Sequence, residues 1–375
     1  MMDNKLNHHS KKILFIIDDL GRGGAEKITA DLASCLADQA HQVSVAVLSN
    51  DKTVQILNKK IHFIDLNIRS EFAFGKLWKN KKLNDCEKRT IDSLINSTSF
   101  DLIILGHHNG YYIYDELSQK DKVWHWIHAE LIEFRNTQNP LKLLKEYLRQ
   151  IRNRKKFKKL FNGKKCITVN SDLARRYQKL CPDSQLTNIA NGTKIIAAPN
   201  PSQAYNKKWD CIFVGRLVAI KQVDHAIKAF LQSGLTGKMA IIGEGPERNR
   251  LEQWVRSLNT QDKVEFLGWI EQPKTYMQQS QCVIMSSFYE GSPVTLLEAI
   301  SLNIPVVSYA SSTGITDLFT EEYKALCLAE KQNIKELAQK LYTLVNHPIQ
   351  YNTAMQRNIS IDRMAEQFLQ LTEQH

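Results

Sequence analysis

The sequence lacks the features that mark several large classes of protein. Its 7 cysteines include no C-x-x-C pair and no regular spacing, which argues against a disulfide scaffold and predicts a reducing compartment. No apolar run approaches the roughly 20 residues that a membrane-spanning helix needs. The apolar run at 13–17 is too short for a secretory signal and is followed by two acids. We therefore expect a cytoplasmic protein, either free or bound to the cytoplasmic face of a membrane.

Several catalytic motifs are also missing. The sequence has no G-x-S-x-G, no G-x-x-x-x-G-K-[ST], no H-E-x-x-H and no G-x-G-x-x-G, which argues against the corresponding hydrolases, nucleotidases, metallopeptidases and dinucleotide enzymes. It has no D-x-D either, which argues against a nucleotide sugar held through a metal. WHWIHAE holds His125 and His128 close together in one expected strand, but no further metal ligand supports them. We expect His125 to pack in the core and His128 to hydrogen-bond a sugar hydroxyl.

What the sequence does have is a regular alternation of short apolar runs with longer helical patterns. An apolar content of 43% suits a globular core, and 375 residues suit two or three domains. The alternation predicts parallel sheets covered by helices, in two halves separated by a turn-rich gap at 197–208. Ligands of such sheets bind beyond the carboxyl ends of the strands. The expected strands are 12–18, 42–49, 61–66, 101–106, 122–128, 166–171, 210–215, 238–243, 264–269, 282–287 and 304–309, and the clearest expected helices are 25–39, 79–96, 221–233 and 247–258.

Positive charge is concentrated in the first half of the chain. The formal net charge is +11, and residues 1–200 hold 33 Lys and Arg against 21 Asp and Glu. The excess peaks in the segment 141–160, where an apolar stripe at helical spacing runs beside basic residues. Such a helix can lie on anionic lipid, so we expect this segment to contact the inner membrane surface or an anionic acceptor. A solvated helix face and a site for a phosphate-rich ligand are the alternatives, and nucleic acid is disfavoured because no nucleic-acid motif accompanies the segment. The stripe consists of Leu141, Leu144, Leu148 and Ile151, with Phe157 as a candidate fifth member.

The stretch SSFYEGSPVTLLEAISLNIPVV joins a buried strand to a helix through a Gly-Ser-Pro turn. We expect the helix to begin at Pro293, with Ser292 as its N-cap. The free N–H groups of its first turn, including those of Val294 and Thr295, then form an anion site beside Gly291, which has no side chain.

The same stretch holds two acids, Glu290 and Glu298. Glu298 lies one helical turn after Val294, so its carboxylate faces the same turn. A phosphate on the N–H groups and a vicinal diol on Glu298 would together describe a nucleotide. A capped core helix with one exposed acid is the alternative.

Other strand ends carry residues suited to the same ligand. CIFVGRLVAIKQ places Arg216 and Lys221 between a strand and the next helix, where an Arg fork and a Lys point charge suit a diphosphate. GEGPERN places Gly243 and Gly245 where the backbone can approach a base or ribose. The alternatives are solvated surface cations and a plain loop. The Gly-rich turn GRGGAEK, at 21–27, allows close approach of a ligand in the same way, or is a tight turn.

These motifs together resemble glycosyltransferase family 4. GGAEK, FVGRLVAIK, GEGPERNRLE, FLGW and FYEGSPVTLLEA follow in this order, and the resemblance is strongest over 211–307. It implies an α/β enzyme of GT-B fold, with two Rossmann-like, doubly wound parallel-sheet domains facing a cleft. The implied parts are an acceptor-side domain at 1–195, a nucleotide-sugar domain at 196–355, and a C-terminal helix at 356–375 that crosses back to the first domain.

The resemblance also implies residue roles. Arg216 and Lys221 would hold the donor diphosphate, Glu298 the ribose diol, and Glu290 with the following amides the transferred sugar and phosphate. His128 would lie near the donor sugar. The implied catalytic residues are Glu290, His128, Arg216 and Lys221. The implied donor-binding residues are Gly23, Gly24, Arg216, Lys221, Gly243, Gly245, Glu290, Gly291, Ser292, Pro293, Val294, Thr295 and Glu298.

Two positions depart from the family pattern. Glu130 stands where an Asp is frequent, which bears on acceptor geometry, and Asp317 stands where a Glu is usual. Asn191-Gly192 and Ser171 match the family's turn before the interdomain linker and the serine that opens the preceding helix.

The implied function is retaining transfer of a hexose or N-acetylhexosamine from a nucleotide-diphosphate sugar, with a UDP-sugar favoured and no metal expected. The implied acceptor is a cell-surface glycan or glycolipid, such as a precursor of lipopolysaccharide, lipooligosaccharide or capsule. The alternatives are a GT-B nucleotide-sugar epimerase or phosphorylase, and a non-catalytic sugar- or membrane-binding protein on the same fold. The intact set of Arg216, Lys221, Glu290 and Glu298 argues against the last.

Overall fold

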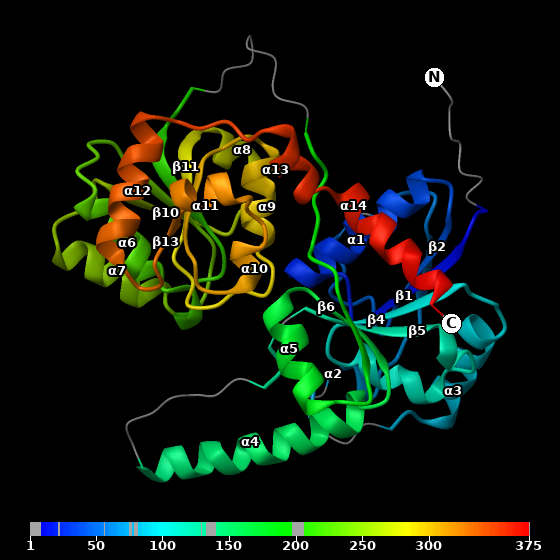
Figure 1. The fold of residues 1–375 in the computed structure, drawn as a ribbon. Coiled ribbons are helices and arrows are strands. Elements are labelled where there is room, and N and C mark those ends of the chain that lie inside the picture. The colour runs from blue at the N-terminus through cyan, green and yellow to red at the C-terminus, as the bar shows by residue number, and fades with distance from the viewer. Residues whose placement is uncertain are drawn as a thin grey trace, which may run out of the picture. The chain divides into compact units, whose positions relative to one another are not determined.

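The structure is a computed structural model, and it describes residues 9–21, 23–55, 57–74, 77–78, 82–128, 130–132, 140–196 and 206–374 (Figure 1). The chain divides into two compact units. Unit 1 comprises residues 1–190 and 364–375, and unit 2 comprises residues 191–363. The expected boundaries were at 195 and 355.

Unit 1 is built on a seven-stranded parallel sheet with the strand order β3-β2-β1-β4-β5-β6-β7. Its central strands are almost wholly apolar and buried, as expected of a parallel sheet that is covered on both faces. The strands are β1 (Lys12–Ile17), β2 (Gln42–Val47), β3 (His62–Asp65), β4 (Leu102–Gly106), β5 (Val123–Ile127), β6 (Lys165–Thr168) and β7 (Gln185–Asn188). The α-helices are α1 (Gly24–Asp38), α2 (Glu71–Phe74), α3 (Asp85–Ile91), α4 (Pro140–Phe161), α5 (Ser171–Leu180) and most of α14 (Ile361–Gln370).

Unit 2 is built on a six-stranded parallel sheet with the order β10-β9-β8-β11-β12-β13, and helices lie on both sides of it (Figure 1). The strands are β8 (Trp209–Val214), β9 (Met239–Ile242), β10 (Val264–Gly268), β11 (Ser280–Met285), β12 (Val306–Tyr309) and β13 (Leu328–Ala329). The helices are α6 (Val223–Gln232), α7 (Arg248–Ser257), α8 (Lys274–Gln278), α9 (Val294–Ser301), α10 (Thr313–Thr316), α11 (Glu321–Cys327), α12 (Ile334–Asn346) and α13 (Thr353–Asn358).

Each sheet has one point at which the strand order reverses. In unit 1 the reversal lies between β1 and β4, and in unit 2 it lies between β8 and β11. The loops that follow two such strands diverge to opposite sides of the sheet, which leaves a crevice at their carboxyl ends where ligands of doubly wound proteins bind. The topology therefore points to the residues after β1 and β4, and to those after β8 and β11.

The predicted α/β architecture with two doubly wound parallel sheets is confirmed. All eleven expected strands are present, but β7 and β13 were not expected. β7 is half exposed and has no apolar run, and β13 has only two residues, so neither gives the pattern of a buried strand. The expected helix at 79–96 is shorter, because α3 begins at Asp85 after its N-cap Asn84 and continues as a π-helix at Asp92–Asn96; residues 79–81 lie outside the described part.

The chain leaves unit 1 after residue 190 and returns to it at residue 364. The two connecting segments pair within unit 2, where the backbone N–H of Thr193 donates to the oxygen of Ile359 and that of Ile361 donates to the oxygen of Thr193. α14 then packs on unit 1, with the ring of Phe368 5.0 Å from that of Trp126. Among the described residues, none of the helices is both long and apolar enough to cross a bilayer.

Candidate functional site

A buried ion pair lies at the carboxyl ends of β8 and β11 in unit 2. Lys221 Nζ is 2.5 Å from Glu290 Oε1, and the hydroxyl of Ser287 donates to the same oxygen at 2.5 Å. Glu290 is only 9% exposed, so its charge depends on these two partners. The two residues come from loops 69 positions apart in the sequence, and they meet at the crevice predicted by the strand order.

The loop that carries Lys221 is held in place by the segment after β11. The backbone N–H of Phe288 donates to the oxygen of Ile220 at 2.8 Å, and the hydroxyl of Ser286 donates to the oxygen of Gln222 at 2.7 Å. Gln222 has a φ of +45°, a left-handed conformation that is uncommon outside glycine. These hydrogen bonds therefore fix the conformation of the turn that carries Lys221.

Arg216 follows β8 directly and is exposed. Within the described part of the chain, its guanidinium makes no hydrogen bond or ion pair. The backbone oxygen of Val214, two residues earlier, accepts a hydrogen bond from the hydroxyl of Thr295 at 3.3 Å, so the end of β8 is tied to the first turn of α9. Unit 2 thus offers one unpaired cation, one paired cation and a helix N-terminus within a single group of loops.

The start of α9 differs from the prediction. Ser292 does not cap the helix, because Pro293 occupies the N-cap position and no side-chain cap hydrogen bond forms. The reason is that Pro293 has extended backbone angles, with ψ at 108°, which delays the helix by one residue. The hydroxyl of Ser292 is instead buried with no hydrogen-bond partner in the described part of the chain, and its carbonyl oxygen accepts from the amide of Asn191 at 3.2 Å.

Glu298 is 6% exposed on α9 and has Lys274 Nζ at 3.9 Å from its Oε1. The alternative interpretation, a capped core helix with one exposed acid, therefore does not describe Glu298. Its carboxylate is withdrawn from solvent beside a cation of α8, as is required of a group that accepts hydrogen bonds from a ligand in a dry site.

The glycines after β9 are required by the protein's own backbone. Gly243 and Gly245 have φ of +141° and +159°, and a Cβ at these positions would lie 1.9 Å from the oxygen of Gly215 and 2.2 Å from that of Leu217. The loop after β9 therefore packs closely against the turn that carries Arg216. This gives the two glycines a structural role in shaping the loop, beside the predicted approach to a nucleotide.

Unit 1 holds the remaining predicted residues. α1 begins at Gly24 with Gly23 as its N-cap, and a Cβ on Gly23 would lie 2.0 Å from Glu26 Oε2. His125 is fully buried between aromatic rings, as predicted. His128 follows β5, and neither of its buried ring nitrogens has a hydrogen-bond partner among the described residues. Burial, with repulsion from neighbouring histidines, lowers the pKa of His128 to about 3, so its imidazole is neutral.

A pocket that sequence reasoning missed lies at the carboxyl ends of β1, β2 and β4, at the strand reversal of unit 1. Its volume is about 230 Å³, and Asp18, His107 and Asn109 line it. Asp18 is 9% exposed and accepts backbone hydrogen bonds from Asn109 and Gly110 at 2.8 and 2.7 Å. Burial raises the pKa of Asp18 to about 6, against the opposing effect of His107. We call it the unit 1 pocket.

The sequence signal for this pocket was present but weak. Asp18 ends the run ILFIID, and His107 and Asn109 follow DLIILG in the segment GHHNG. Polar residues directly after two buried strands are what the strand-end rule asks for, but the rule applies only once the two strands are known to be neighbours at a reversal.

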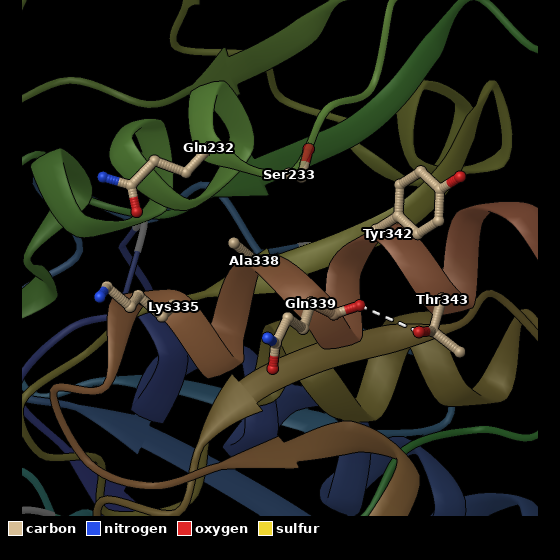
Figure 2. Close-up of a pocket in the computed structure, with 7 residues that line it drawn as sticks. All are labelled: Gln232, Ser233, Lys335, Ala338, Gln339, Tyr342 and Thr343. Atoms are coloured by element: carbon tan, nitrogen blue, oxygen red, sulfur yellow. Dashed lines mark hydrogen bonds between the residues drawn. The ribbon is translucent and has the colours of Figure 1, made fainter.

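A larger hollow, of about 400 Å³, lies on unit 2 between α6 and α12 (Figure 2). Gln232 and Ser233 line one side, and Lys335, Gln339 and Tyr342 line the other. It lies on the helices and not at the carboxyl ends of the strands. We therefore do not consider it a candidate active site, despite its size. Within the described ranges, no group of three or more His, Cys, Asp or Glu is arranged to hold a metal ion.

Comparison with known proteins shows which family the second unit resembles. Residues 195–360 match the family described as glycosyl transferases group 1. An uncharacterized glycosyltransferase of Haemophilus influenzae is 24% identical over 96% of this chain and 99% of its own. A Campylobacter jejuni protein named as GalNAc-alpha-(1->4)-GalNAc-alpha-(1->3)-diNAcBac-PP-undecaprenol alpha-1,4-N-acetyl-D-galactosaminyltransferase is 24% identical over 96% of this chain and 98% of its own.

Solved structures extend the likeness to the fold. The structure of HepE from Anabaena, in complex with UDP and glucose, aligns with a TM-score of 0.69 over 97% of this chain and 100% of that one, at 16% identity. At this identity the likeness is one of fold, and it covers both sheets.

Proposed function

Because this chain is a group 1 glycosyltransferase with the GT-B fold, we propose that it transfers a hexose or N-acetylhexosamine, with retention of anomeric configuration, from a nucleoside diphosphate sugar to a cell-surface glycan. A UDP-sugar is the favoured donor, since the HepE structure contains UDP. A glycolipid or other lipid-linked acceptor is favoured because the Campylobacter relative is named for an undecaprenol-linked substrate.

The observation that carries the proposal is the group of charges at the strand reversal of unit 2. Arg216 is exposed and unpaired within the described chain, Lys221 is held by Glu290 at 2.5 Å, and the first turn of α9 is tied to the same strand end. A guanidinium fork, an ammonium and free helix N–H groups are the donors that a diphosphate requires.

This arrangement stabilises the departing diphosphate. In a retaining transfer, the bond between the sugar C1 and the diphosphate oxygen breaks while the acceptor oxygen bonds to C1 on the same face. Negative charge then grows on the diphosphate, where Arg216, Lys221 and the α9 amides stabilise it more than in the ground state. The leaving phosphate oxygen takes the acceptor's proton, so no protein general base is required. Glu290 acts as a positioning residue, since its carboxylate is already engaged by Lys221 and Ser287.

The remaining residues complete the donor site in this proposal. Glu298 accepts the ribose hydroxyls. His128 is neutral, so it can exchange hydrogen bonds with a hydroxyl of the transferred sugar without adding a charge beside the developing oxocarbenium ion.

We further propose that α4 binds an anionic membrane surface. Leu141, Leu144, Leu148 and Ile151 are 73%, 58%, 58% and 47% exposed, whereas Phe157 is 1% exposed and packs against Tyr177 and Phe161. The first half of α4 extends beyond the other helices and strands of unit 1 (Figure 1). An exposed apolar stripe flanked by cations suits the boundary between headgroups and acyl chains. This would place the enzyme at the cytoplasmic face of the inner membrane, where a lipid-linked acceptor is found.

A two-step experiment tests the proposed function. Thermal shift with UDP-, GDP- and ADP-sugars identifies the donor, and NMR of the product made with a lipid-linked acceptor reports the anomeric configuration. We expect a UDP-sugar to raise the melting temperature and the α-configured donor to give an α-linked product. An inverted product would refute retention, and epimerised or phosphorolysed donor without transfer would favour an epimerase or phosphorylase.

A further inference from the structure

The turn that joins β11 to α9 is held by the residue that precedes α10. The hydroxyl of Ser312 donates to the backbone oxygen of Glu290 at 2.7 Å. Ser312 is 7% exposed and occupies the N-cap position of α10, but among the described residues its side chain makes no cap hydrogen bond. A serine at an N-cap ordinarily accepts a hydrogen bond from the backbone of its own helix. Here the hydroxyl bonds to the turn, so α10 lacks this capping contact.

Gly314, inside α10, makes a second close contact with the same turn. A Cβ at this position would lie 2.0 Å from the oxygen of Gly291 and 2.6 Å from that of Glu290, which is far closer than van der Waals contact allows. The φ of Gly314 is not positive, so the position requires glycine for space and not for its backbone conformation. Any larger residue would push α10 and the turn apart.

These two contacts determine the direction of the turn's N–H groups. The oxygens of Glu290 and Gly291 both lie close to Gly314, so both carbonyl groups point toward α10. A trans peptide is planar, and its N–H points away from its C=O. The N–H groups that share peptides with these carbonyls, those of Gly291 and Ser292, are therefore directed away from α10. Successive N–H groups with a common direction form an anion-binding concavity, which lies next to the first turn of α9.

We propose that Ser312 and Gly314 are positioning residues of the donor site, which hold the turn at 290–292 so that its N–H groups and those of the first turn of α9 face the diphosphate. This rests on the proposed transferase function, because it concerns the donor of that reaction. Both residues act through the turn and do not touch the donor. Loss of the Ser312 hydroxyl therefore weakens diphosphate binding, whereas loss of a comparable buried hydroxyl elsewhere in unit 2 does not.

Calorimetry with UDP, GDP and ADP tests this proposal on three variants. Ser312→Ala removes the hydrogen bond to the turn, and Gly314→Ala adds a methyl group where the oxygen of Gly291 lies. Ser280→Ala is the matched control. Ser280 is also buried, and its hydroxyl also donates to a backbone oxygen at 2.7 Å, but that oxygen belongs to Met277 and lies at the amino end of β11.

We expect Ser312→Ala to bind the diphosphate about three- to tenfold more weakly than the wild type, the range that one lost hydrogen bond allows. Gly314→Ala should bind it more weakly still. Ser280→Ala should lose stability as Ser312→Ala does, but keep the affinity of the wild type. Wild-type affinity in Ser312→Ala and Gly314→Ala, or an equal loss in Ser280→Ala, would overturn the proposal and leave the proposed function in place.

Hydrogen exchange of the ligand-free proteins tests the hold on the turn without a nucleotide. The reporters are the N–H groups of Leu296 and Leu297, which donate to the oxygen of Pro293 at 3.1 and 3.3 Å. Ser312→Ala should speed their exchange several-fold and Ser280→Ala should not, because only the first variant loosens the start of α9. Equal exchange in the wild type and Ser312→Ala would overturn the proposal. A wild type that binds no diphosphate, with faster exchange in Ser312→Ala, would contradict the proposed function and not the hold of Ser312 on the turn.

Discussion

Arg216 and Lys221 carry the same charge, but different surroundings hold them. Arg216 is exposed and has no partner among the described residues, whereas Lys221 forms an ion pair with a carboxylate that is 9% exposed and also accepts a hydrogen bond from Ser287. If the proposed site is right, removing Arg216 takes away only a ligand contact. Removing Lys221 also leaves a buried charge uncompensated, which is the costly way to break an ion pair.

Mutation of the two cations should therefore have different effects on stability. We expect Arg216→Ala to weaken binding of the nucleoside diphosphate by about 1.5–3 kcal/mol without changing the melting temperature. Lys221→Ala should weaken binding by a similar amount and also lower the free energy of unfolding by about 3 kcal/mol. Calorimetry and urea unfolding measure the two quantities.

The control is Lys221→Ala combined with Glu290→Gln, which removes the carboxylate charge that Lys221→Ala alone leaves buried and unpaired. It should recover most of the lost stability but not the affinity. If both single variants bind the diphosphate as the wild type does, the assignment of the clamp is wrong.

Asp18 predicts a pH dependence of stability. Its carboxyl has a pKa of about 6 in the folded protein, against 3.8 as the reference value. The folded state thus holds the proton more tightly, so stability falls as pH rises from about 4 through 6. Asp18→Asn has no charge to bury. We expect it to equal the wild type near pH 4 and to be more stable by roughly 3 kcal/mol near pH 7.

Urea unfolding of both proteins at the two pH values measures this difference. A constant difference between wild type and Asp18→Asn would mean that Asp18 is ionised at no cost. A group that destabilises the protein at neutral pH is expected where function, and not folding, determines the residue.

At the scale of elements, α4 is the helix whose exposed face lacks an explanation within unit 1. Reversing Arg152, Arg154 and Lys155 to Glu should release the protein from anionic vesicles, because each cation near such a surface contributes about 1 kcal/mol. We expect vesicle affinity to fall by more than about a hundredfold while UDP affinity stays unchanged. Lys156 is left in place because its ammonium group donates to the carbonyl of Trp78. Co-sedimentation with anionic vesicles is the measurement.

A matched triple reversal of Lys59, Lys82 and Arg89 controls for net charge, since these residues are also exposed cations of unit 1. It should pellet with vesicles as the wild type does. Equal pelleting of all three proteins, or pelleting by none, would remove the support for a membrane role of α4.

Most elements could be predicted from the sequence because each carries its own periodic pattern. β1 and β4 read as buried strands, and α4 reads as an amphipathic helix. The elements that were predicted wrongly depend on their surroundings in the fold and not on their own sequence pattern. β7 pairs with β6 at the edge of its sheet and needs no apolar run, and the start of α9 depends on the backbone angle of Pro293, which a capping rule based on residue type does not fix.

At the scale of the whole molecule, the sequence could suggest candidate site residues only where a contiguous motif contains them. Glu290 to Glu298 lie in one stretch, and Arg216 and Lys221 lie in another, so resemblance could assign roles to them. Asp18 and Asn109 are 91 positions apart and meet only because β1 and β4 are neighbours at a strand reversal. Strand order is a property of the assembled sheet, and no local pattern contains it.

The catalytic cycle as a whole should not depend on a divalent metal. The sequence lacks D-x-D, and in the proposed site Arg216 and Lys221 would supply the positive charge that a metal would otherwise bring to the diphosphate. We expect transfer, or slow donor hydrolysis, to continue in excess EDTA at an unchanged rate. Loss of activity with chelator and its recovery with Mn²⁺ or Mg²⁺ would contradict this.

The return of the chain to unit 1 after residue 364 has a consequence for biosynthesis. While the polypeptide emerges from the ribosome, the sheet of unit 1 can assemble early, but Trp126 has no Phe368 to cover it until all of unit 2 has been translated. Unit 1 starts folding first and is completed last, so a nascent chain exposes this apolar surface to chaperones for the time that unit 2 takes to synthesise. Stalled chains that end at residue 363 should therefore be cleaved in unit 1 much faster by protease than chains that include α14.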